Sequence, residues 1–461
     1  MFGLMALSLN AYSLENWALA LQKKLQPLGN RGALSIRSLN GREILNINEN
    51  QQVIPASIAK IVSTSCSLET LSPGYQFKTE FLTKGSIKSG ELSSSLIIKG
   101  SGDPSFVIED LREQVARLRQ LYKIQKLNGT LLIDVSYLTG GRLPISDAFD
   151  GDDGRAFTAD LTSLTFNHNS FAVWVASSPG DQKALVEILP QDALPIKLNS
   201  SGVKIRSGNP GPGNGNVRYD PKSKTVTISG TFGPEALPKA VYRAAPDPYE
   251  YFYETFRSLW IQSGGEWKNP SFKITDSSTG ATLLTRHESK ALSSIVRDVN
   301  KSSLNLGAEM ILLAAGAEQF GWPASREKSS RVISNCLKKY QISEKSIHLD
   351  NASGLSKTAK ITTEAFTQYI ESYLRTSTAP DFIASLPVIG QDGTMKARFK
   401  EYAGRARVKT GTLSNVASLS GLVYPEKGEP MVFTFVINGM PGNSPEAQKY
   451  ENLVLTSMLA Q

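Results

Sequence analysis

The sequence predicts a mixed α/β (α+β) protein in which one domain is interrupted by a long insertion. Helical and strand-like patterns alternate at both ends of the chain, over residues 1–70 and 285–461. The middle instead consists largely of short strand-like runs separated by Gly, Pro and Asn, which are typical of turns. With 461 residues, 40% of them hydrophobic, the chain has apolar material for about three domains. We therefore expect one split domain that carries two nested inserted domains.

The first part of the split domain predicts a helix, a hairpin and a buried helix. Apolar residues recur at helical spacing over residues 13–28. Two strand-like runs at 33–39 and 43–47 are joined through an Asn-Gly pair, which is typical of a hairpin turn. The mostly apolar run at 53–71 predicts a long helix that is buried.

The second part of the split domain adds further helices and strands. Together with the first part, they predict an antiparallel sheet flanked by helices on both faces. The expected helices and strands occupy residues 289–300, 306–320, 331–340, 405–412, 417–424, 431–438 and 446–459.

The insertion divides into two expected domains. One is a strand–helix–strand unit over residues 96–164, in which Asp103-Pro104 is expected to cap the helix. The other is β-rich and comprises residues 71–95 and 165–284. The clearest patterns behind this division are strands at 96–99 and 129–135 and helices at 108–122 and 249–263.

Composition and motifs argue against several classes of protein. The net charge is +8, but Lys and Arg are spread along the chain, so we expect no nucleic-acid partner. Outside the N-terminal stretch, no run approaches the roughly 20 apolar residues of a transmembrane helix. The three histidines lie in no HExxH pattern, and the GSG at residues 100–102 lacks the third glycine of a dinucleotide fingerprint. We therefore expect neither a metal nor a cofactor.

Two further features leave alternatives open. Residues 1–13 are apolar and end in Ala-Tyr-Ser, which suits signal-peptide cleavage, although no basic residue opens the run. We favour the remnant of a signal peptide, which implies a periplasmic protein, over an apolar start of the first helix. Cys66 and Cys336 lie in expected helices without a CxxC pattern, and we favour two buried thiols over a mutual disulfide.

Three short motifs, SxxK, SxN and KTG, occur in this order. Ser57 and Lys60 form the first in apolar surroundings, whereas Ser201 and Ser325, which also precede a Lys by three residues, lie in polar segments. Residues three apart share a helix face, so the Lys60 amine can reach the Ser57 hydroxyl. Burial disfavours a charged lysine, so Lys60 can act as the base that activates the serine. The alternative is that Ser57 only caps the helix.

The other two motifs supply groups that suit an anionic peptide end. Lys409-Thr410-Gly411-Thr412 lies in an expected strand. Its glycine lets another backbone approach, and its lysine and threonine side chains can bind an anion. An edge strand there can also pair with a peptide main chain. Ser303 and Asn305 precede an apolar helix and can present polar side chains to a cleft. The alternative for Lys409 is an ordinary exposed strand lysine, and the stretch from Ser303 to Asn305 would be unremarkable if it occurred alone.

The ordered trio of motifs resembles that of the penicillin-binding proteins and serine β-lactamases. The insertion of about 240 residues between the first two motifs resembles the class C low-molecular-mass penicillin-binding proteins, the D-alanyl-D-alanine carboxypeptidase/endopeptidase family (penicillin-binding protein 4 type). The resemblance implies a β-lactamase-like transpeptidase domain with nested insertions. Further stretches that resemble this family are GSGDP at 100–104, NASGLS at 351–356, LPV at 386–388 and QDGT at 391–394.

The resemblance implies roles for the catalytic residues. Ser57 attacks the substrate carbonyl to form an acyl-enzyme, and Lys60 accepts its proton. Ser303 relays a proton to the leaving amine, and Asn305 holds the acyl chain and Lys60. The backbone N–H groups of Ser57 and Thr412 form the oxyanion hole, where negative charge develops.

The same resemblance implies the substrate contacts. Lys409 and Thr410 bind the terminal carboxylate of a peptidoglycan stem peptide. Asp152, beside Phe157, contacts the amino-bearing end of that peptide, the alternative being an ordinary loop carboxylate. Lys357 stands where many relatives carry Arg, and Lys lacks the bidentate fork with which Arg recognises a carboxylate.

The leading hypothesis is therefore a serine D-Ala-D-Ala carboxypeptidase and D,D-endopeptidase that β-lactams inhibit. The alternatives are a β-lactamase and a non-catalytic sensor of β-lactams or muropeptides. The expected partners are peptidoglycan stem peptides and β-lactams, and peripheral association with membrane or cell wall is left open.

Overall fold

The computed structural model describes residues 16–145, 154–177, 184–191, 196–206, 216–220, 222–233 and 237–461. Residues 1–13, where we expected a signal-peptide remnant, and Asp152 lie outside this part of the chain. The described residues form two compact units: the first unit runs up to Tyr75 and from Ala291 to Gln461, and the second unit lies between Gln76 and Lys290. Both boundaries are close to those expected at 70/71 and 284/285.

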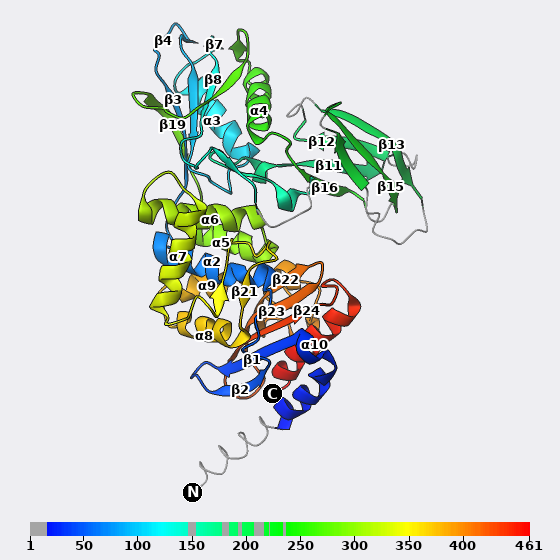
Figure 1. Ribbon diagram of the computed structural model, residues 1–461. Coiled ribbons are helices and arrows are strands. Elements are labelled where there is room, and N and C mark those ends of the chain that lie inside the picture. Colours follow the sequence, from blue (N-terminus) through cyan, green and yellow to red (C-terminus); the bar gives the residue numbers. More distant parts are fainter. Residues whose placement is uncertain are drawn as a thin grey trace. The chain divides into compact units, whose positions relative to one another are not determined.

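The first unit is built on a five-stranded antiparallel sheet in the order β2-β1-β24-β23-β22 (Figure 1). Its strands are β1 (Gly32–Ser38), β2 (Glu43–Ile47), β22 (Ala406–Leu413), β23 (Val416–Val423) and β24 (Met431–Asn438), and a separate pair consists of β20 (Ile347–His348) and β21 (Lys360–Ile361). Its helices are residues 16–25, η1 (Gln26–Arg31), η2 (Ala56–Ala59), α2 (Lys60–Leu71), α5 (Leu292–Ser302), α6 (Asn305–Phe320), α7 (Arg326–Lys339), α8 (Thr363–Tyr373), α9 (Ala379–Ser385), η6 (Gly393–Met395), η7 (Lys400–Tyr402) and α10 (Pro445–Leu459).

Pairing of β1 with β24 joins the two ends of the chain in one sheet. The register runs without interruption from Gly32 opposite Ile437 to Ser38 opposite Met431. This pairing confirms the expected antiparallel sheet, to which both parts of the split domain contribute. β1 can therefore pair with β24 only after the whole insertion between them has been synthesised.

Alternation along the strands gives the sheet two different faces. Phe433 and Phe435 of β24 pack into an apolar cluster with α10 and the N-terminal helix. Thr434, between them, points to the opposite face, where its hydroxyl accepts a hydrogen bond from Thr367 of α8 at 2.9 Å. Helices therefore cover both faces, because side chains that alternate along a buried strand require partners on each side.

The helix that was expected at 53–71 begins later than its pattern suggested. Ala56 has a φ of 52°, outside the helical range, and a single 3-10 turn, η2, precedes α2. The two helices α8 and α9 were not among the expected elements. The sequence of α8 mixes Thr, Glu and Gln with aromatic residues, although most of the helix is buried.

The second unit contains a mixed five-stranded sheet in the order β18-β8-β6-β3-β19 and several smaller sheets. Its strands are β3 (Lys78–Thr83), β4 (Ile87–Lys88), β5 (Glu91–Leu92), β6 (Leu96–Gly100), β7 (Lys126–Leu127), β8 (Leu131–Asp134), β9 (Arg142–Leu143), β10 (Leu161–Thr162), β11 (Ser170–Ser177), β12 (Ala184–Leu189), β13 (Lys197–Ile205), β14 (Asn216–Asp220), β15 (Thr225–Phe232), β16 (Lys239–Ala244), β17 (Glu266–Trp267), β18 (Phe272–Thr275) and β19 (Thr282–Glu288). Its helices are α3 (Ile108–Gln120), η3 (Ala156–Thr158), η4 (Asn167–Asn169) and α4 (Pro248–Gln262).

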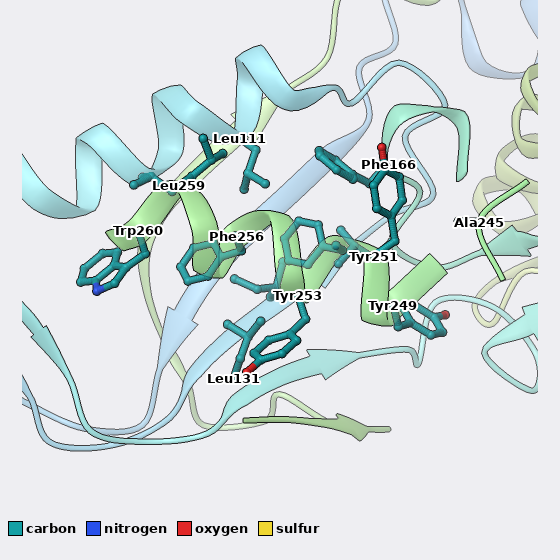
Figure 2. Close-up of a cluster of buried hydrophobic side chains, with 14 of the residues drawn as sticks. Leu111, Leu131, Phe166, Ala245, Tyr249, Tyr251, Tyr253, Phe256, Leu259 and Trp260 are labelled. Carbon is teal, nitrogen blue, oxygen red and sulfur yellow. The ribbon is translucent and has the colours of Figure 1, made fainter. Parts of the chain in front are cut away.

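Aromatic residues of α4 form much of the core of the second unit (Figure 2). The Phe256 and Trp260 rings stack with centroids 6.1 Å apart, and Tyr251 contacts Phe166 at 5.3 Å. Leu111 of α3 belongs to the same cluster. Large aromatic side chains bury more area than aliphatic ones, so one helix with an aromatic face can hold several short strands together.

Strand β6, helix α3 and strand β8 form the expected strand–helix–strand unit, with the two strands parallel. Asp103 does not cap α3, however, since the helix begins after Val107. The Asp103 carboxylate instead accepts hydrogen bonds from the backbone N–H and the hydroxyl of Ser105, at 2.8 and 2.7 Å, which closes a turn before the helix.

One sheet combines strands from both of the expected inserted domains. β3 and β18 belong to the segments assigned to the β-rich domain, whereas β6 and β8 belong to the segment assigned to the strand–helix–strand domain. The boundary drawn at 95/96 therefore separates strands that pair. The division of the insertion into two domains stays a prediction.

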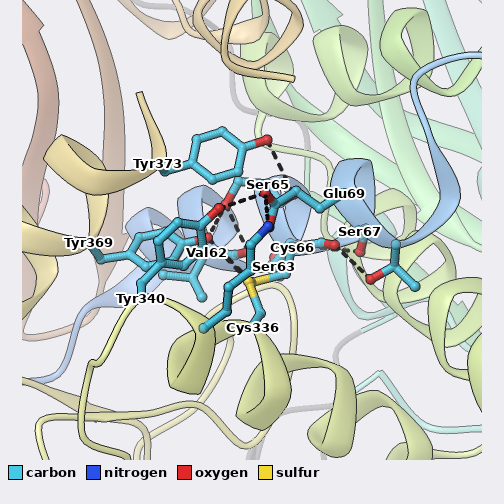
Figure 3. The surroundings of a disulfide bond; sticks show 12 residues. Val62, Ser63, Ser65, Cys66, Ser67, Glu69, Cys336, Tyr340, Tyr369 and Tyr373 are labelled. Atoms are coloured by element: carbon cyan, nitrogen blue, oxygen red, sulfur yellow. Dashed lines mark hydrogen bonds and ion pairs between the residues drawn. A yellow bond between two sulfur atoms is a disulfide. The ribbon is translucent and has the colours of Figure 1, made fainter. Parts of the chain in front are cut away.

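Cys66 of α2 and Cys336 of α7 form a disulfide, so the favoured expectation of two buried thiols is wrong. The Cα atoms are 5.8 Å apart, within the range that a disulfide requires. Tyr340, Tyr369 and Tyr373 surround the bond (Figure 3), and the Tyr369 hydroxyl lies 3.3 Å from the Cys66 sulfur. The sequence separation of 270 residues concealed this proximity in the sequence.

Replacing both cysteines with alanine should lower the stability of the first unit. A cross-link over 270 residues restricts the unfolded chain strongly, so the expected loss is about 2–5 kcal/mol in the free energy of unfolding. Urea denaturation followed by tryptophan fluorescence would measure it. Alkylation of the unfolded, unreduced wild type, followed by mass spectrometry, provides the control, and the appearance of two modified thiols would contradict the pairing.

Candidate active site

The SxxK motif spans the junction between η2 and α2. Residues three apart in a 3-10 turn lie directly above one another, so Ser57 and Lys60 share a face. Lys60 Nζ lies 3.1 Å from Ser57 Oγ. The serine is half-buried and the lysine is fully buried, so a substrate can reach the hydroxyl but not the amine. Ser57 caps neither helix, and the alternative of a plain helix cap is therefore wrong.

Two further acceptors surround the Lys60 amine. Nζ donates hydrogen bonds to Asn305 Oδ1 at 2.8 Å and to the Ser353 carbonyl at 2.7 Å. A neutral amine has two N–H donors and one lone pair. When these two acceptors take both N–H groups, the lone pair is left to face the Ser57 hydroxyl. The geometry therefore suits the transfer of a proton from serine to lysine.

The charge state of Lys60 depends on its surroundings. Burial, reinforced by the nearby charge of Lys409, lowers the pKa of Lys60 well below its usual value, while Glu309 acts in the opposite direction. Burial disfavours an ammonium ion because the interior solvates charge poorly. Lys60 is therefore far easier to deprotonate than an exposed lysine, which is what a general base requires.

Lys409 and Ser303 form a second pair beside the first. Lys409 Nζ donates to Ser303 Oγ at 2.9 Å and to the Thr410 carbonyl at 2.8 Å. Burial lowers the pKa of Lys409 to about 7. Ser303 ends α5 with a φ of 57°, a left-handed conformation that is costly for a non-glycine residue. The structure thus brings the SxN and KTG motifs into direct contact.

The backbone of β22 passes close to that of Ser57. A Cβ atom on Gly411 would lie 2.8 Å from the Ser57 nitrogen and 2.3 Å from Ser418 Oγ, so this position requires glycine. Ser418 in turn donates to the Pro55 carbonyl at 2.7 Å, which fixes the entrance of η2 against the sheet. β22 is the last strand of its sheet, and Val388 already bridges to Arg407 in its first half, so the later half, which contains Gly411, can accept a peptide in an extended conformation.

A turn at residues 351–356, which carries the NASGLS stretch, supports the motif from the other side. Gly354 has a φ of 74°, and a Cβ atom there would lie 1.9 Å from the Ala56 carbonyl oxygen. The turn therefore lies directly against Ala56, the residue before Ser57. Its Ser353 carbonyl is the one that accepts a hydrogen bond from Lys60.

The remaining expected site residues have different surroundings. Thr410 Oγ1 donates to Thr394 Oγ1 at 2.9 Å, and Thr412 is exposed on the same strand. Lys357 is exposed in the first unit just after the NASGLS turn. Phe157 belongs to the second unit, where the residue is 39% exposed and its ring centroid lies 5.8 Å from the Arg155 guanidinium.

The two competing SxxK matches are not assembled into a similar site. Ser325 caps α7 by accepting a hydrogen bond from the Lys328 backbone N–H at 3.3 Å, while the Lys328 amine donates to the carbonyls of Gly321 and Pro323. Ser201 is exposed in β13. Burial of the lysine therefore distinguishes Ser57 from both.

Sequence reasoning missed two residues of the site, Glu309 and Thr394. Glu309 accepts hydrogen bonds from the backbone of the NASGLS turn. In the sequence, Glu309 could have been noticed as a single acidic residue inside the apolar run that follows Asn305. Thr394 was part of the QDGT stretch that pointed to the family, but only the contact with Thr410 gives it a place.

Comparison with known proteins identifies the family. The D-Ala-D-Ala carboxypeptidase 3 (S13) family matches residues 18–460. The chain belongs to this family. It is 26% identical over 436 residues to the D-alanyl-D-alanine carboxypeptidase of Actinomadura sp. (strain R39), covering 90% of this chain and 79% of the relative. It is 24% identical over 433 residues to the D-alanyl-D-alanine carboxypeptidase DacB of Haemophilus influenzae, covering 91% and 87%.

Solved structures confirm the fold expected for the S13 family. The crystal structure of penicillin binding protein 4 (dacB) from Haemophilus influenzae matches with a TM-score of 0.77 and 21% identity, covering 96% of this chain and 99% of that chain. A predatory peptidoglycan endopeptidase, Bd3459 from Bdellovibrio bacteriovorus, matches with a TM-score of 0.52 and 16% identity, covering 92% of each chain. The resemblance to the penicillin-binding protein 4 type is thus confirmed.

The described residues include no helix that is long and apolar enough to cross a membrane. Within the same part of the chain, no three His, Cys, Asp or Glu side chains are grouped so that they could hold a metal ion.

Substituting Gly354 with alanine should destabilise the protein more than the same change at Gly428. Both glycines have a positive φ, 74° and 94°, so both substitutions incur a backbone cost of about 1–2 kcal/mol. Only Gly354→Ala also drives a Cβ atom into the Ala56 carbonyl, whereas nothing lies within 4 Å at Gly428. We expect an additional loss of about 1–3 kcal/mol, measured by urea denaturation. Equal losses would show that the turn is not packed tightly against Ala56.

Proposed function

We propose that this chain is a serine-type D-Ala-D-Ala carboxypeptidase that acts on peptidoglycan stem peptides through an acyl-enzyme on Ser57. One observation carries the proposal: the Ser57 hydroxyl lies 3.1 Å from the amine of a fully buried lysine whose other two acceptors are fixed. This arrangement activates a serine without a histidine, as covalent catalysis requires.

The acylation step follows from this arrangement. Neutral Lys60 takes the proton of the Ser57 hydroxyl as the oxygen attacks the carbonyl carbon between the two D-alanines. The backbone N–H groups of Ser57 and Thr412 stabilise the negative charge on the carbonyl oxygen. The tetrahedral intermediate then collapses, the peptide C–N bond breaks, and the proton passes to the leaving amine through Ser303. Water hydrolyses the resulting ester on Ser57.

Lys409 orients the substrate by its charge. In its protonated form it attracts the terminal carboxylate of the stem peptide, and the Thr410 hydroxyl supplies a further hydrogen bond. An endopeptidase reaction uses the same steps, with the amine of a neighbouring stem peptide as the leaving group. We propose this second activity as well, since a structural relative of the same fold is described as a peptidoglycan endopeptidase.

The remaining assignments rest on the family resemblance. We propose that Asp152 and Phe157 meet the amino-bearing end of the stem peptide, that Lys357 lies along it, and that β-lactams inhibit the enzyme by acylating Ser57. We also propose a periplasmic location, where peptidoglycan is accessible.

Benzylpenicillin should label Ser57 stoichiometrically. The β-lactam ring opens on the same hydroxyl that attacks the peptide, so the tryptic peptide that contains Ser57 should gain the mass of the drug. The Ser57→Ala variant should not be labelled, whereas Ser201→Ala and Ser325→Ala should behave as the wild type. Labelling of Ser201 or Ser325 would overturn the assignment. Rapid turnover of nitrocefin without a stable adduct would favour a β-lactamase instead.

The pH dependence of kcat/KM should reveal the charge on Lys409. Because burial lowers the pKa of Lys409 to about 7, the free enzyme holds the cation below this pH and loses it above. Cleavage of a peptide with a free terminal carboxylate should therefore weaken as the pH rises through this region. A matched peptide with a C-terminal amide has no carboxylate to bind, so its profile should lack this alkaline fall. An identical fall for both peptides would contradict the role of Lys409.

A further inference from the structure

Glu309 is a carboxylate buried in the apolar interior beside the active site. It lies in α6, four residues after Asn305, so the two side chains share a helix face. Only 4% of Glu309 is exposed, and every residue from Leu306 to Ala317 is buried. An acidic side chain in such surroundings is costly unless its oxygens are hydrogen-bonded.

Both oxygens of Glu309 bind the backbone of the NASGLS turn. Oε2 accepts from the Ala352 N–H at 3.1 Å, and Oε1 accepts from the Ser353 N–H at 2.8 Å. Two adjacent N–H groups therefore converge on one carboxylate. The pair fixes the orientation of the peptide units at the centre of the turn.

The same turn holds the Lys60 amine. The Ser353 carbonyl accepts a hydrogen bond from Lys60 Nζ at 2.7 Å, and the N–H of the same residue is the one that Glu309 binds. On the other side, Ser63 of α2 donates to the Ala352 carbonyl at 2.7 Å. A displacement of the turn would thus be passed directly to the hydrogen bond that orients the Lys60 lone pair toward Ser57.

Charge links the two residues as well. Glu309 raises the pKa of Lys60, against the lowering by burial and by Lys409. Burial raises the pKa of Glu309, while hydrogen bonds from the turn and the charge of Arg326 favour its ionised form. Besides this mutual effect, the charge of Lys409 acts on Lys60 and the charge of Arg326 acts on Glu309.

We propose that Glu309 is a positioning residue for the general base: its carboxylate holds the Ser353 carbonyl in place for Lys60 and balances the charge of the protonated lysine after Ser57 has given up its proton. The proposal deepens the proposed function and rests on it for its catalytic meaning. Glu309 itself touches neither the substrate nor the reacting atoms.

The Glu309→Gln variant tests the role of the charge. Glutamine is almost isosteric, but its NH2 group would face one of the two backbone N–H donors, so at least one hydrogen bond is lost. We expect the rate of Ser57 acylation by benzylpenicillin to fall roughly 10- to 100-fold, since small misplacements of catalytic groups have effects of this size. Because a negative charge near Lys60 is removed, the rising limb of the acylation pH profile should also move to lower pH.

Two further variants separate positioning from simple destabilisation. Glu451→Gln removes another buried carboxylate of the first unit. Glu451 lies in α10 and pairs with Arg398 at 2.9 Å. The Glu451→Gln variant should lower the stability of the protein without moving the rising limb of the acylation pH profile. Glu309→Asp keeps the charge but shortens the side chain, so the rate should fall while the limb stays near its wild-type position. If Glu309→Gln does not fold, the aspartate variant decides, and a wild-type rate in it would overturn the proposal.

An NMR titration distinguishes failure of this inference from failure of the proposed function. The titration of Lys60, followed in protein with 13C-labelled lysine and assigned with a Lys60→Arg variant, requires no catalysis. It should move to lower pH in Glu309→Gln and remain unchanged in Glu451→Gln. An unmoved Lys60 titration in Glu309→Gln would overturn the inference, whatever the enzyme does. Wild-type protein that is not acylated at Ser57 would instead overturn the proposed function.

Discussion

Burial of the Lys60 amine is the constraint on which the site depends. An ammonium group without solvent loses much of its stability, so the lysine either finds acceptors for every N–H or gives up a proton. The protein supplies Ser57, Asn305 and the Ser353 carbonyl, which come from three separate segments. The amide oxygens of Asn305 and Ser353 do not exchange protons with the Lys60 amine. Among its three partners, Lys60 can therefore exchange a proton only with the Ser57 hydroxyl.

The helix that carries Lys60 is unusual, since the mostly apolar run in which it lies includes several polar residues that are nevertheless buried. Ser63, Thr64, Ser65 and Ser67 of α2 are almost completely inaccessible. Their hydroxyls donate to backbone carbonyls four residues earlier or, for Ser63, to the neighbouring turn. The disulfide and the tyrosine cluster then fix α2 on the side of α7 (Figure 3). Lys60 therefore lies on a helix that is itself fixed by the disulfide and by buried hydrogen bonds.

Close backbone contacts complete the site where side chains would not fit. Gly411 brings β22 next to the Ser57 nitrogen, and Gly354 brings the NASGLS turn next to Ala56. The first two residues of η2 are therefore constrained by main-chain atoms, which vary less in position than side chains. Such contacts explain why an irregular start, with a positive φ at Ala56, is maintained directly before Ser57.

The sequence by itself determined the mixed fold, the split domain and the ordered motifs, because apolar period and motif spacing are local properties of the chain. It also separated Ser57 from Ser201 and Ser325, since the polarity of neighbouring residues indicates burial. Only the tertiary structure decided the partners of these residues. Cys66 and Cys336 lie 270 residues apart in sequence, and the carboxylate of Glu309 meets a turn more than 40 residues later. Contacts of this kind depend on how helices pack around the sheet, and no local pattern records that packing.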